Sequence, residues 1–282
     1  MARLRVKQSR AVRAVWAAAL IFSLCACANR TERAVRIAQR GGLTAAVVQG
    51  TQFRHEIFMN TAPRGAVLFV FIDGDGSPWS RDGQEPASDP TPRRPLALEL
   101  AAHTPRSVLY VGRPCYFSVR SDAACEPSVW TSGRYSAGVV ASLAAVVSGF
   151  AASNGFGRIV LIGYSGGGAL AVLMAPHIPS TRTVVTIAAD LDIAAWSAWH
   201  GYLPLDGSLN PASQAPLDPA IRQWHLVGGL DVNVPERVSR RYLDRVNPAQ
   251  IWRFPRFDHS CCWVEQWPTL LARIETELGE SR

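Results

Sequence analysis

Residues Arg158–Met174, with the sequence RIVLIGYSGGGALAVLM, decide the fold class of this chain. The run IVLIG is apolar throughout, which is typical of a strand buried on both faces of a sheet. From Gly166 the chain is rich in small and apolar residues, which predicts a helix reaching about Pro176. Between the strand and the helix stands GYSGG, residues 163–167, a GxSxG pattern at a strand-to-helix turn.

Ser165, at the centre of that pattern, is the candidate nucleophile. A serine on such a sharp turn needs small neighbours two positions away, and Gly163 and Gly167 meet this need. The N-terminus of the following helix adds a partial positive charge beside the serine. The alternative is a serine that only caps the helix. The flanking strand and helix favour the catalytic interpretation.

The rest of the chain alternates strands with helices, which predicts a mostly parallel central sheet with helices on both faces. Two early segments predict an antiparallel edge pair: Leu43–Gln49 and Phe53–Met59. Further strands are expected at Ala66–Ile72, Ser107–Val111, Thr183–Ala188, Gln223–Gly228 and Ile251–Phe254. Helices are expected at Ala137–Phe150, Val238–Val246 and Trp267–Leu278. We expect one domain over residues 43–282, with long connections at 77–95 and, cap-like, at about 190–220.

The first 26 residues have the pattern of a bacterial export signal. Basic residues precede an apolar run, Ala14–Leu24, which is too short to span a bilayer but suits a secretory signal. The run ends in LCAC, which resembles a lipobox and predicts cleavage before Cys27 and lipidation of that cysteine. We expect a signal peptide over residues 1–26, a tether over 27–42 and a lipid anchor on a membrane, with the outer membrane favoured, facing the periplasm. The alternative is a soluble periplasmic or secreted protein.

Charge and cysteine content agree with export. The leader holds five basic residues and no acidic one, so its removal lowers the net charge from +7 to +2. No basic stripe remains to suggest a nucleic-acid partner. Cys115 and Cys125 are the first candidate for a disulfide, with Cys261 and Cys262 either bonded to each other or reduced. No CxxC motif or spaced Cys/His cluster is present, so neither a metal nor an organic cofactor is expected.

With Ser165 in this setting, the chain resembles the α/β-hydrolase family over essentially the whole region after the leader. The family orders its triad as nucleophile, acid and histidine, with the histidine after the last strand. The resemblance implies that the acid is Asp231, in GGLDVNVP, and that the histidine is His259, in FPRFDHSCCW. It also implies oxyanion-hole donors at the backbone N–H groups of Gly166 and Asp75.

Other acids compete with Asp231. Asp190 and Asp192 follow the preceding strand, and some family members take their acid from that position. Asp258 adjoins His259, but adjacent side chains seldom meet in a geometry that orients an imidazole.

The loop that holds Asp75 departs from the family pattern. It reads Asp73-Gly74-Asp75-Gly76, where many relatives have His-Gly. A backbone N–H group can donate a hydrogen bond whatever its side chain is, so the departure is compatible with an oxyanion hole. The two carboxylates would nevertheless repel an oxyanion unless they are turned away or paired.

Several side chains are expected near the substrate. Trp130 and Tyr135 are candidates for the pocket wall, and Arg134 either meets a substrate carboxylate or, as we favour, forms a structural ion pair. The candidates in the connection at 190–220 are Trp196, Trp199, His200 and Tyr202.

The reaction class that these residues predict is hydrolysis of an ester or related acyl bond in a small-molecule substrate, through a Ser-His-Asp triad and an acyl-enzyme. The alternatives are a peptidase or acyltransferase that acts on envelope material, and a noncatalytic lipoprotein that keeps the fold as a binding module.

Overall fold

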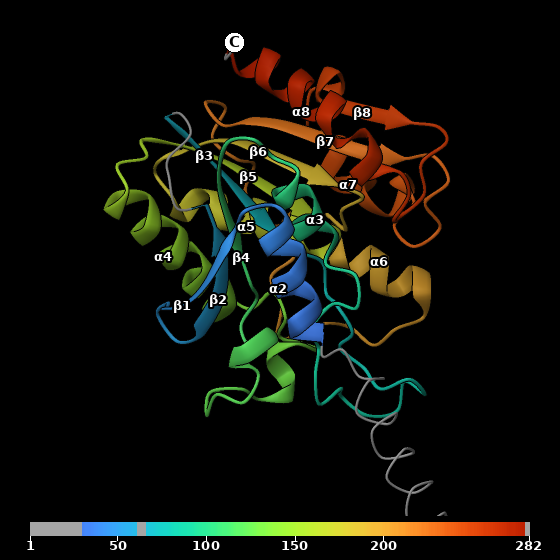
Figure 1. Ribbon diagram of the computed structural model, residues 1–282. Helices are drawn as coiled ribbons and strands as arrows, with labels where there is room; N and C mark the ends of the chain where they lie inside the picture. The colour runs from blue at the N-terminus through green and yellow to red at the C-terminus, as the bar shows by residue number, and fades with distance from the viewer. Residues whose placement is uncertain (1–29, 61–65, 280–282) are drawn as a thin grey trace, which may run out of the picture.

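The computed structural model describes residues 30–60 and 66–279, and its centre is an eight-stranded sheet (Figure 1). The strands are β1 (Thr44–Gln49), β2 (Arg54–Met59), β3 (Val67–Ile72), β4 (Ser107–Val111), β5 (Arg158–Tyr164), β6 (Thr181–Ile187), β7 (Arg222–Gly228) and β8 (Ile251–Phe254). Their order across the sheet is β1-β2-β4-β3-β5-β6-β7-β8. All pairs from β4 to β8 are parallel, whereas β2 is antiparallel to both of its neighbours. The predicted mostly parallel sheet with an antiparallel edge is confirmed.

Helices cover both faces of this sheet. They are α2 (Arg30–Arg40), α3 (Leu96–Ala102), α4 (Ala137–Ser153), α5 (Gly166–Met174), α6 (Ile193–His200), α7 (Arg240–Leu243) and α8 (Trp263–Leu278). Short 3₁₀ helices lie at Phe117–Val119, Pro127–Val129, Ala175–His177, Pro211–Ser213, Glu236–Ser239 and Pro248–Gln250. Helices α4, α5 and α7 pack into one apolar core, and α2, α3 and α8 pack into the other. Strand β3 serves both cores because its side chains alternate: Leu68 and Val70 face the first, Phe69 and Phe71 the second.

Helix α5 packs against the sheet at a distance that only glycine permits. A Cβ atom at Gly163 would lie 2.1 Å from the carbonyl oxygen of Gly167. A Cβ atom at Gly167 would lie 2.2 Å from the carbonyl oxygen of Ile72. The expectation of small residues on both sides of Ser165 is therefore confirmed, and the reason is steric contact with the helix and with the neighbouring strand.

Three segments differ from the sequence predictions. The signal peptide and Cys27 lie outside the described residues, but the expected tether holds helix α2, whose Ala34 and Ala38 are buried against the fold. Helices α3 and α6 were not predicted: α3 follows a polar, proline-rich connection, and α6 precedes one. Among the described residues, no helix combines the length and the apolar character that crossing a bilayer requires.

Both pairs of remaining cysteines form disulfides. Cys115 and Cys125 are bonded with their Cα atoms 5.5 Å apart, as predicted. Closing a loop of this size stabilises a fold by about 2–3 kcal/mol. Cys261 and Cys262 form a vicinal disulfide, one of the two states that the sequence left open.

Candidate active site

Ser165 lies on the turn between β5 and α5 with a backbone that few non-glycine residues adopt. Its φ and ψ are +52° and −127°, and its N–H donates to the carbonyl oxygen of Ile187 at 2.9 Å. The loop after β3 passes close beside it, because a Cβ atom at Gly74 would lie 3.1 Å from Ser165 Cβ. A strained turn with a serine at its tip is the local geometry of a nucleophile elbow.

Asp231 and His259 meet at the same edge of the sheet, after β7 and β8. His259 Nδ1 lies 2.8 Å from Asp231 Oδ2. The Asp231 side chain is 1% exposed and that of His259 is 21% exposed, so the carboxylate is shielded while the ring reaches solvent. The other carboxylate oxygen, Oδ1, accepts the backbone N–H groups of Asn233 and Val234 at 2.9 and 2.7 Å. The carboxylate is therefore fixed, with one oxygen left for the imidazole.

Backbone contacts between the two loops explain why these residues meet. The N–H groups of Gly229 and Leu230, just before Asp231, donate to the carbonyl oxygens of Phe254 and Phe257 at 2.9 Å each. The indole N–H of buried Trp263 also donates to the His259 carbonyl oxygen at 3.1 Å. The Asp231 loop and the His259 loop thus form one hydrogen-bonded unit.

The competing acids have other partners. Asp192 caps α6 by accepting the N–H of Ala195 at 3.3 Å. Asp258 accepts the backbone N–H of Cys261 at 2.6 Å, within its own loop. Asp190 lies 3.3 Å from the Tyr135 hydroxyl. Of these aspartates, Asp231 is the one whose carboxylate bonds His259.

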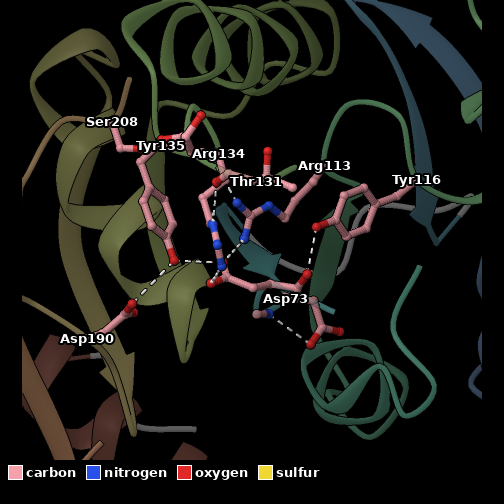
Figure 2. Close-up of polar contacts among 11 residues, drawn as sticks. Asp73, Arg113, Tyr116, Thr131, Arg134, Tyr135, Asp190 and Ser208 are labelled. Atoms are coloured by element: carbon pink, nitrogen blue, oxygen red, sulfur yellow. Dashed lines mark hydrogen bonds and ion pairs between the residues drawn. The ribbon is translucent and has the colours of Figure 1, made fainter. Parts of the chain in front are cut away.

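The Asp75 carboxylate is held by buried side chains from neighbouring segments, those of Arg113, Arg134 and Tyr135, which Figure 2 labels. Arg113 Nη1 and the Tyr135 hydroxyl donate to Oδ1 at 2.5 and 2.6 Å, and Arg134 Nη1 donates to Oδ2 at 2.7 Å. The Tyr116 hydroxyl donates to the Asp75 carbonyl oxygen at 2.7 Å. Burial alone would raise the pKa of Asp75, but the charges of Arg134 and Arg113 and the bond from Tyr135 lower it to about 2.

Asp190 and Asp75 share the hydroxyl group of Tyr135, and Figure 2 shows the contact between Tyr135 and Asp190. Burial, together with the negative charge of Asp75, raises the pKa of Asp190 to about 8. At neutral pH, Asp75 is therefore ionised and Asp190 is mainly protonated. We call Asp75, Arg113, Arg134, Tyr135 and Asp190 the Asp75 cluster.

Asp73, the other carboxylate of the loop, points toward the start of helix α3. It accepts backbone N–H groups from Ala97 and Leu98 and the N–H of Gly74, which lies at 3.1 Å. Burial raises its pKa to about 7 despite these bonds. The two carboxylates were expected to repel an oxyanion unless they were turned away or paired. Asp73 is turned away toward α3, and Asp75 is paired with Arg113 and Arg134.

The backbone amides of Gly166 and Asp75 remain as candidate oxyanion donors. Hydrogen bonding within the described part of the chain leaves both amides without a protein acceptor. The two residues are in contact, since a Cβ atom at Gly166 would lie 2.2 Å from Asp75 Oδ1 and 2.3 Å from the Tyr135 hydroxyl. The Asp75 cluster therefore supports the turn that carries Ser165.

A cavity of about 1070 Å³ opens above these groups. Ser165 and His259 both line it, as do Trp196 and Tyr202 from the connection after β6. Trp196 Nε1 donates to the Asn233 carbonyl oxygen at 3.1 Å, which ties this aromatic wall to the Asp231 loop. The candidate triad therefore faces a pocket of a size that suits a small-molecule ligand.

Some expected pocket residues do not line this cavity. The expectation for Trp130 and Tyr135 is wrong, because both are buried in the fold behind it. Trp199 is absent from the wall and packs under the guanidinium of Arg237, 3.8 Å from its ring centroid. His200 also lies behind the wall, where it stacks on Tyr202 at 5.1 Å. Arg134 forms the structural ion pair that the sequence favoured, although it also lines the cavity.

Two sets of basic residues were missed by the sequence analysis. Arg113 lies two residues after the end of β4, and Asp75 lies three residues after the end of the neighbouring strand β3. Their positions after adjacent parallel strands were the one feature of the sequence that could have indicated a contact. Arg93 and Arg94 line the cavity from the long connection after β3, and no local pattern distinguishes them from other surface arginines. Among the described residues, no group of His, Cys, Asp or Glu side chains has an arrangement suited to a metal ion.

Comparisons with known proteins show which fold this is. No protein-family model and no curated sequence matches the chain. Solved structures do match. Esterase Pf2001 of Pyrococcus furiosus is 14% identical with a TM-score of 0.57, over 85% of this chain and 94% of that one. The chain has the α/β-hydrolase fold.

Two further structures of this fold match the chain with similarly low sequence identity. A serine hydrolase without a lid from Xanthomonas campestris is 14% identical with a TM-score of 0.51, over 83% of this chain and 92% of that one. Puromycin hydrolase is 15% identical with a TM-score of 0.58, over 86% of this chain but only 40% of its own, longer chain. At these identities the likeness establishes the fold, and the chemistry has to be argued from the site.

Proposed function

We propose that this protein is a serine hydrolase that cleaves a carboxylic ester or a related acyl bond through a covalent acyl-enzyme. The observation that carries the proposal is the 2.8 Å contact between the shielded Asp231 carboxylate and His259, in a cavity that Ser165 also lines. This is the set of groups that activates a serine hydroxyl, which is otherwise a weak nucleophile. The esterase and serine hydrolase that share the fold support the same reaction class.

In the proposed reaction, the imidazole of His259 takes the Ser165 proton as Oγ bonds to the acyl carbon. His259 then returns the proton to the leaving alcohol as the bond between the acyl carbon and that alcohol breaks. A water molecule, deprotonated by His259, releases the acid and restores the Ser165 hydroxyl. Asp231 holds the ring with Nδ1–H toward its own carboxylate and stabilises the imidazolium.

The negative charge that develops on the acyl oxygen would be met by the amides of Gly166 and Asp75. Both amides are free of protein acceptors, and the helix dipole of α5 adds a partial positive charge at the same place. One such donor contributes roughly 3–4 kcal/mol to the stability of the transition state. The ion pairs of Asp75 keep its own carboxylate from opposing that charge.

The test is covalent labelling of the folded, oxidised protein with a fluorophosphonate probe, with Ser165→Ala as the control. We expect one modified peptide, which contains Ser165, and no labelling of the control. Absence of labelling in folded protein would overturn the hydrolase proposal and leave a binding module on a hydrolase fold.

We also propose that the protein is exported and anchored through a lipid on Cys27. The two disulfides support this, because such bonds persist in oxidising compartments. We expect the full chain to fractionate with membranes and the Cys27→Ser variant to be released or left unprocessed. Equal membrane association of both proteins would contradict lipid anchoring.

A further inference from the structure

The two walls of the cavity differ in chemistry. The connection after β6 supplies Trp196, Tyr202 and Leu203, and the last two are exposed to solvent at the mouth. The connection after β3 supplies Arg93 and Arg94, which are also exposed, and one exposed aromatic side chain, Trp79. The strands β3 and β6 lie on either side of β5, and the two connections line the same cavity as Ser165; we call them the basic wall and the apolar wall after their charged and uncharged side chains.

The basic wall is held in place by its backbone. Arg30 on α2 donates to the carbonyl oxygens of Asp89 and Thr91 at 2.6 and 2.9 Å, and Arg33 donates to the carbonyl oxygen of Arg93 at 3.3 Å. The two arginines therefore project from a segment whose position is set by helix α2. A preorganised cation loses less freedom on binding a ligand than one on a loose loop.

The acidic residues of the cavity do not neutralise these arginines. The charged side chains of the cavity wall, besides His259, are Asp73, Asp75, Arg93, Arg94 and Arg134. Asp75 is bound by Arg113 and Arg134, and Asp73 is buried against the start of α3. Arg94 has an ion pair with Glu99 at 3.3 Å, but this pair is half exposed and therefore weak.

The Asp75 cluster beside the cavity places two guanidinium groups around one carboxylate. That carboxylate is ionised, whereas burial keeps Asp190 mainly protonated at neutral pH. Burial also raises the pKa of Asp73 to about 7, which opposes ionisation of this lining carboxyl group. The exposed arginines therefore meet little opposing charge, and positive charge in a partly enclosed cavity attracts anions more strongly than it would in open solvent.

We propose that the substrate is an acyl ester that carries an anionic group, bound by Arg93 and Arg94, and an apolar group that packs on Trp196 and Tyr202. This inference rests on the proposed hydrolase function and narrows its substrate class. The anionic group belongs either to the acyl part or to the alcohol part, and these two cases are separated by experiment.

The experiment compares kcat/KM within two matched ester pairs. For the acyl side, the pair is the para-nitrophenyl monoester of glutaric acid and para-nitrophenyl pentanoate, which have acyl chains of equal length. For the alcohol side, the pair is para-acetoxybenzoate and its methyl ester. We expect the anionic member of at least one pair to be preferred. The preference should fall by up to about fivefold for each arginine replaced in Arg93→Gln and Arg94→Gln, the size of an exposed ion pair.

The matched control is Arg182→Gln, which removes one positive charge at the start of β6, on the opposite edge of the sheet. It should leave the preference and the activity unchanged. Equal kcat/KM within both pairs, or a preference that survives the double substitution of Arg93 and Arg94, would overturn the inference.

A binding measurement separates this inference from the hydrolase proposal. The Ser165→Ala protein is titrated by calorimetry with para-acetoxybenzoate and with its methyl ester. Tighter binding of the anion, lost on replacing Arg93 and Arg94, would support the inference even if the wild-type protein hydrolysed no ester. Ester hydrolysis without charge preference in binding or turnover would refute the inference alone.

Discussion

Asp231 and Asp75 follow strands on either side of the one that carries Ser165, yet their carboxylates have different surroundings. Asp231 offers one oxygen to the imidazole of His259, whose ring reaches the cavity. Asp75 is bound by Arg113, Arg134 and Tyr135, all of them buried.

Two carboxylates can therefore lie near one reacting serine without repelling the charge that develops there. Asp231 keeps an oxygen for a ring that exchanges protons with the substrate, so its side chain takes part in the proposed chemistry. The side chain of Asp75 is fully engaged by the protein, and its backbone amide is what remains for the reaction. We expect substitutions at Asp231 to affect turnover and substitutions at Asp75 to affect folding.

Asp231→Asn should have the largest effect. The amide would favour the wrong tautomer of His259, and we expect kcat to fall by about 10⁴-fold with the fold retained. Steady-state turnover of an ester, with circular dichroism as a folding check, measures this. Asp192→Asn is the matched control, because Asp192 caps α6 and does not bond His259. A similar loss in both variants would mean that Asp231 is not the acid of the triad.

Asp75→Ala should mainly lower stability. It leaves Arg113 and Arg134 buried without their carboxylate, and breaking a buried ion pair in this way costs about 3–5 kcal/mol. Urea unfolding gives the free energy. Asp122→Ala removes the carboxylate partner of exposed Arg54, and it should cost at most about 1 kcal/mol. Equal costs would show that the Asp75 cluster is not a structural centre.

Gly166→Ala tests the contact between the turn that carries Ser165 and the loop that carries Asp75. The added methyl group would lie 2.2 Å from Asp75 Oδ1, so the loop and the elbow must separate. We expect a loss of about 1–3 kcal/mol in stability from overpacking and a kcat lower by about 10²-fold from a displaced oxyanion donor. Gly157→Ala, at a glycine with open space around it, should change neither property. Normal turnover of Gly166→Ala would argue against an oxyanion hole at this position.

Asp190→Asn should change the pH dependence of stability. The pKa of Asp190 is raised to about 8 in the folded protein, against about 4 for an unfolded aspartate. The wild-type protein therefore loses stability as pH rises from about 4 to about 8, because only its unfolded state releases this proton. Asparagine does not titrate, so the variant lacks this pH-dependent loss. The free energy of unfolding of the variant, relative to wild type, should therefore rise by up to about 1.4 kcal/mol per pH unit over this range. Chemical denaturation at several pH values measures the difference, and parallel curves would contradict a protonated Asp190.

Much of the fold could be predicted from the sequence because its signals are local. The apolar runs of β3 and β5 and the turn around Ser165 each depend on a few consecutive residues. Helix α6 was missed because it lies in a connection rich in proline and polar residues, and α3 because it is short. The segment of α2 was expected to be a tether, since the burial of Ala34 and Ala38 depends on contacts with distant parts of the chain.

The candidate site also contains residues that could be predicted from the sequence and residues that could not. The strand-to-helix turn named Ser165, and the resemblance to the α/β-hydrolase family named Asp231 and His259, with Asp190 and Asp192 left as alternative acids. The expectation that Trp130 and Tyr135 line the pocket was wrong, because residues near a crevice in sequence can point into the core instead. Arg113 was missed because its partner Asp75 is 38 residues away, and the available signal was only that both residues follow neighbouring parallel strands.

The strand-to-helix turn around Ser165 and the class of sheet could be predicted from the amino-acid sequence alone. They depend on side-chain volume and apolar patterning over a few consecutive residues, whereas Asp231 and His259 were named through a family resemblance. The folded structure was needed to show that the pKa of Asp75 is lowered, that the pKa of Asp190 is raised, and that Arg93 and Arg94 share a cavity with Trp196 and Tyr202. Charge state and pocket shape depend on burial and on partners far apart in the chain, and these exist only once the chain has folded.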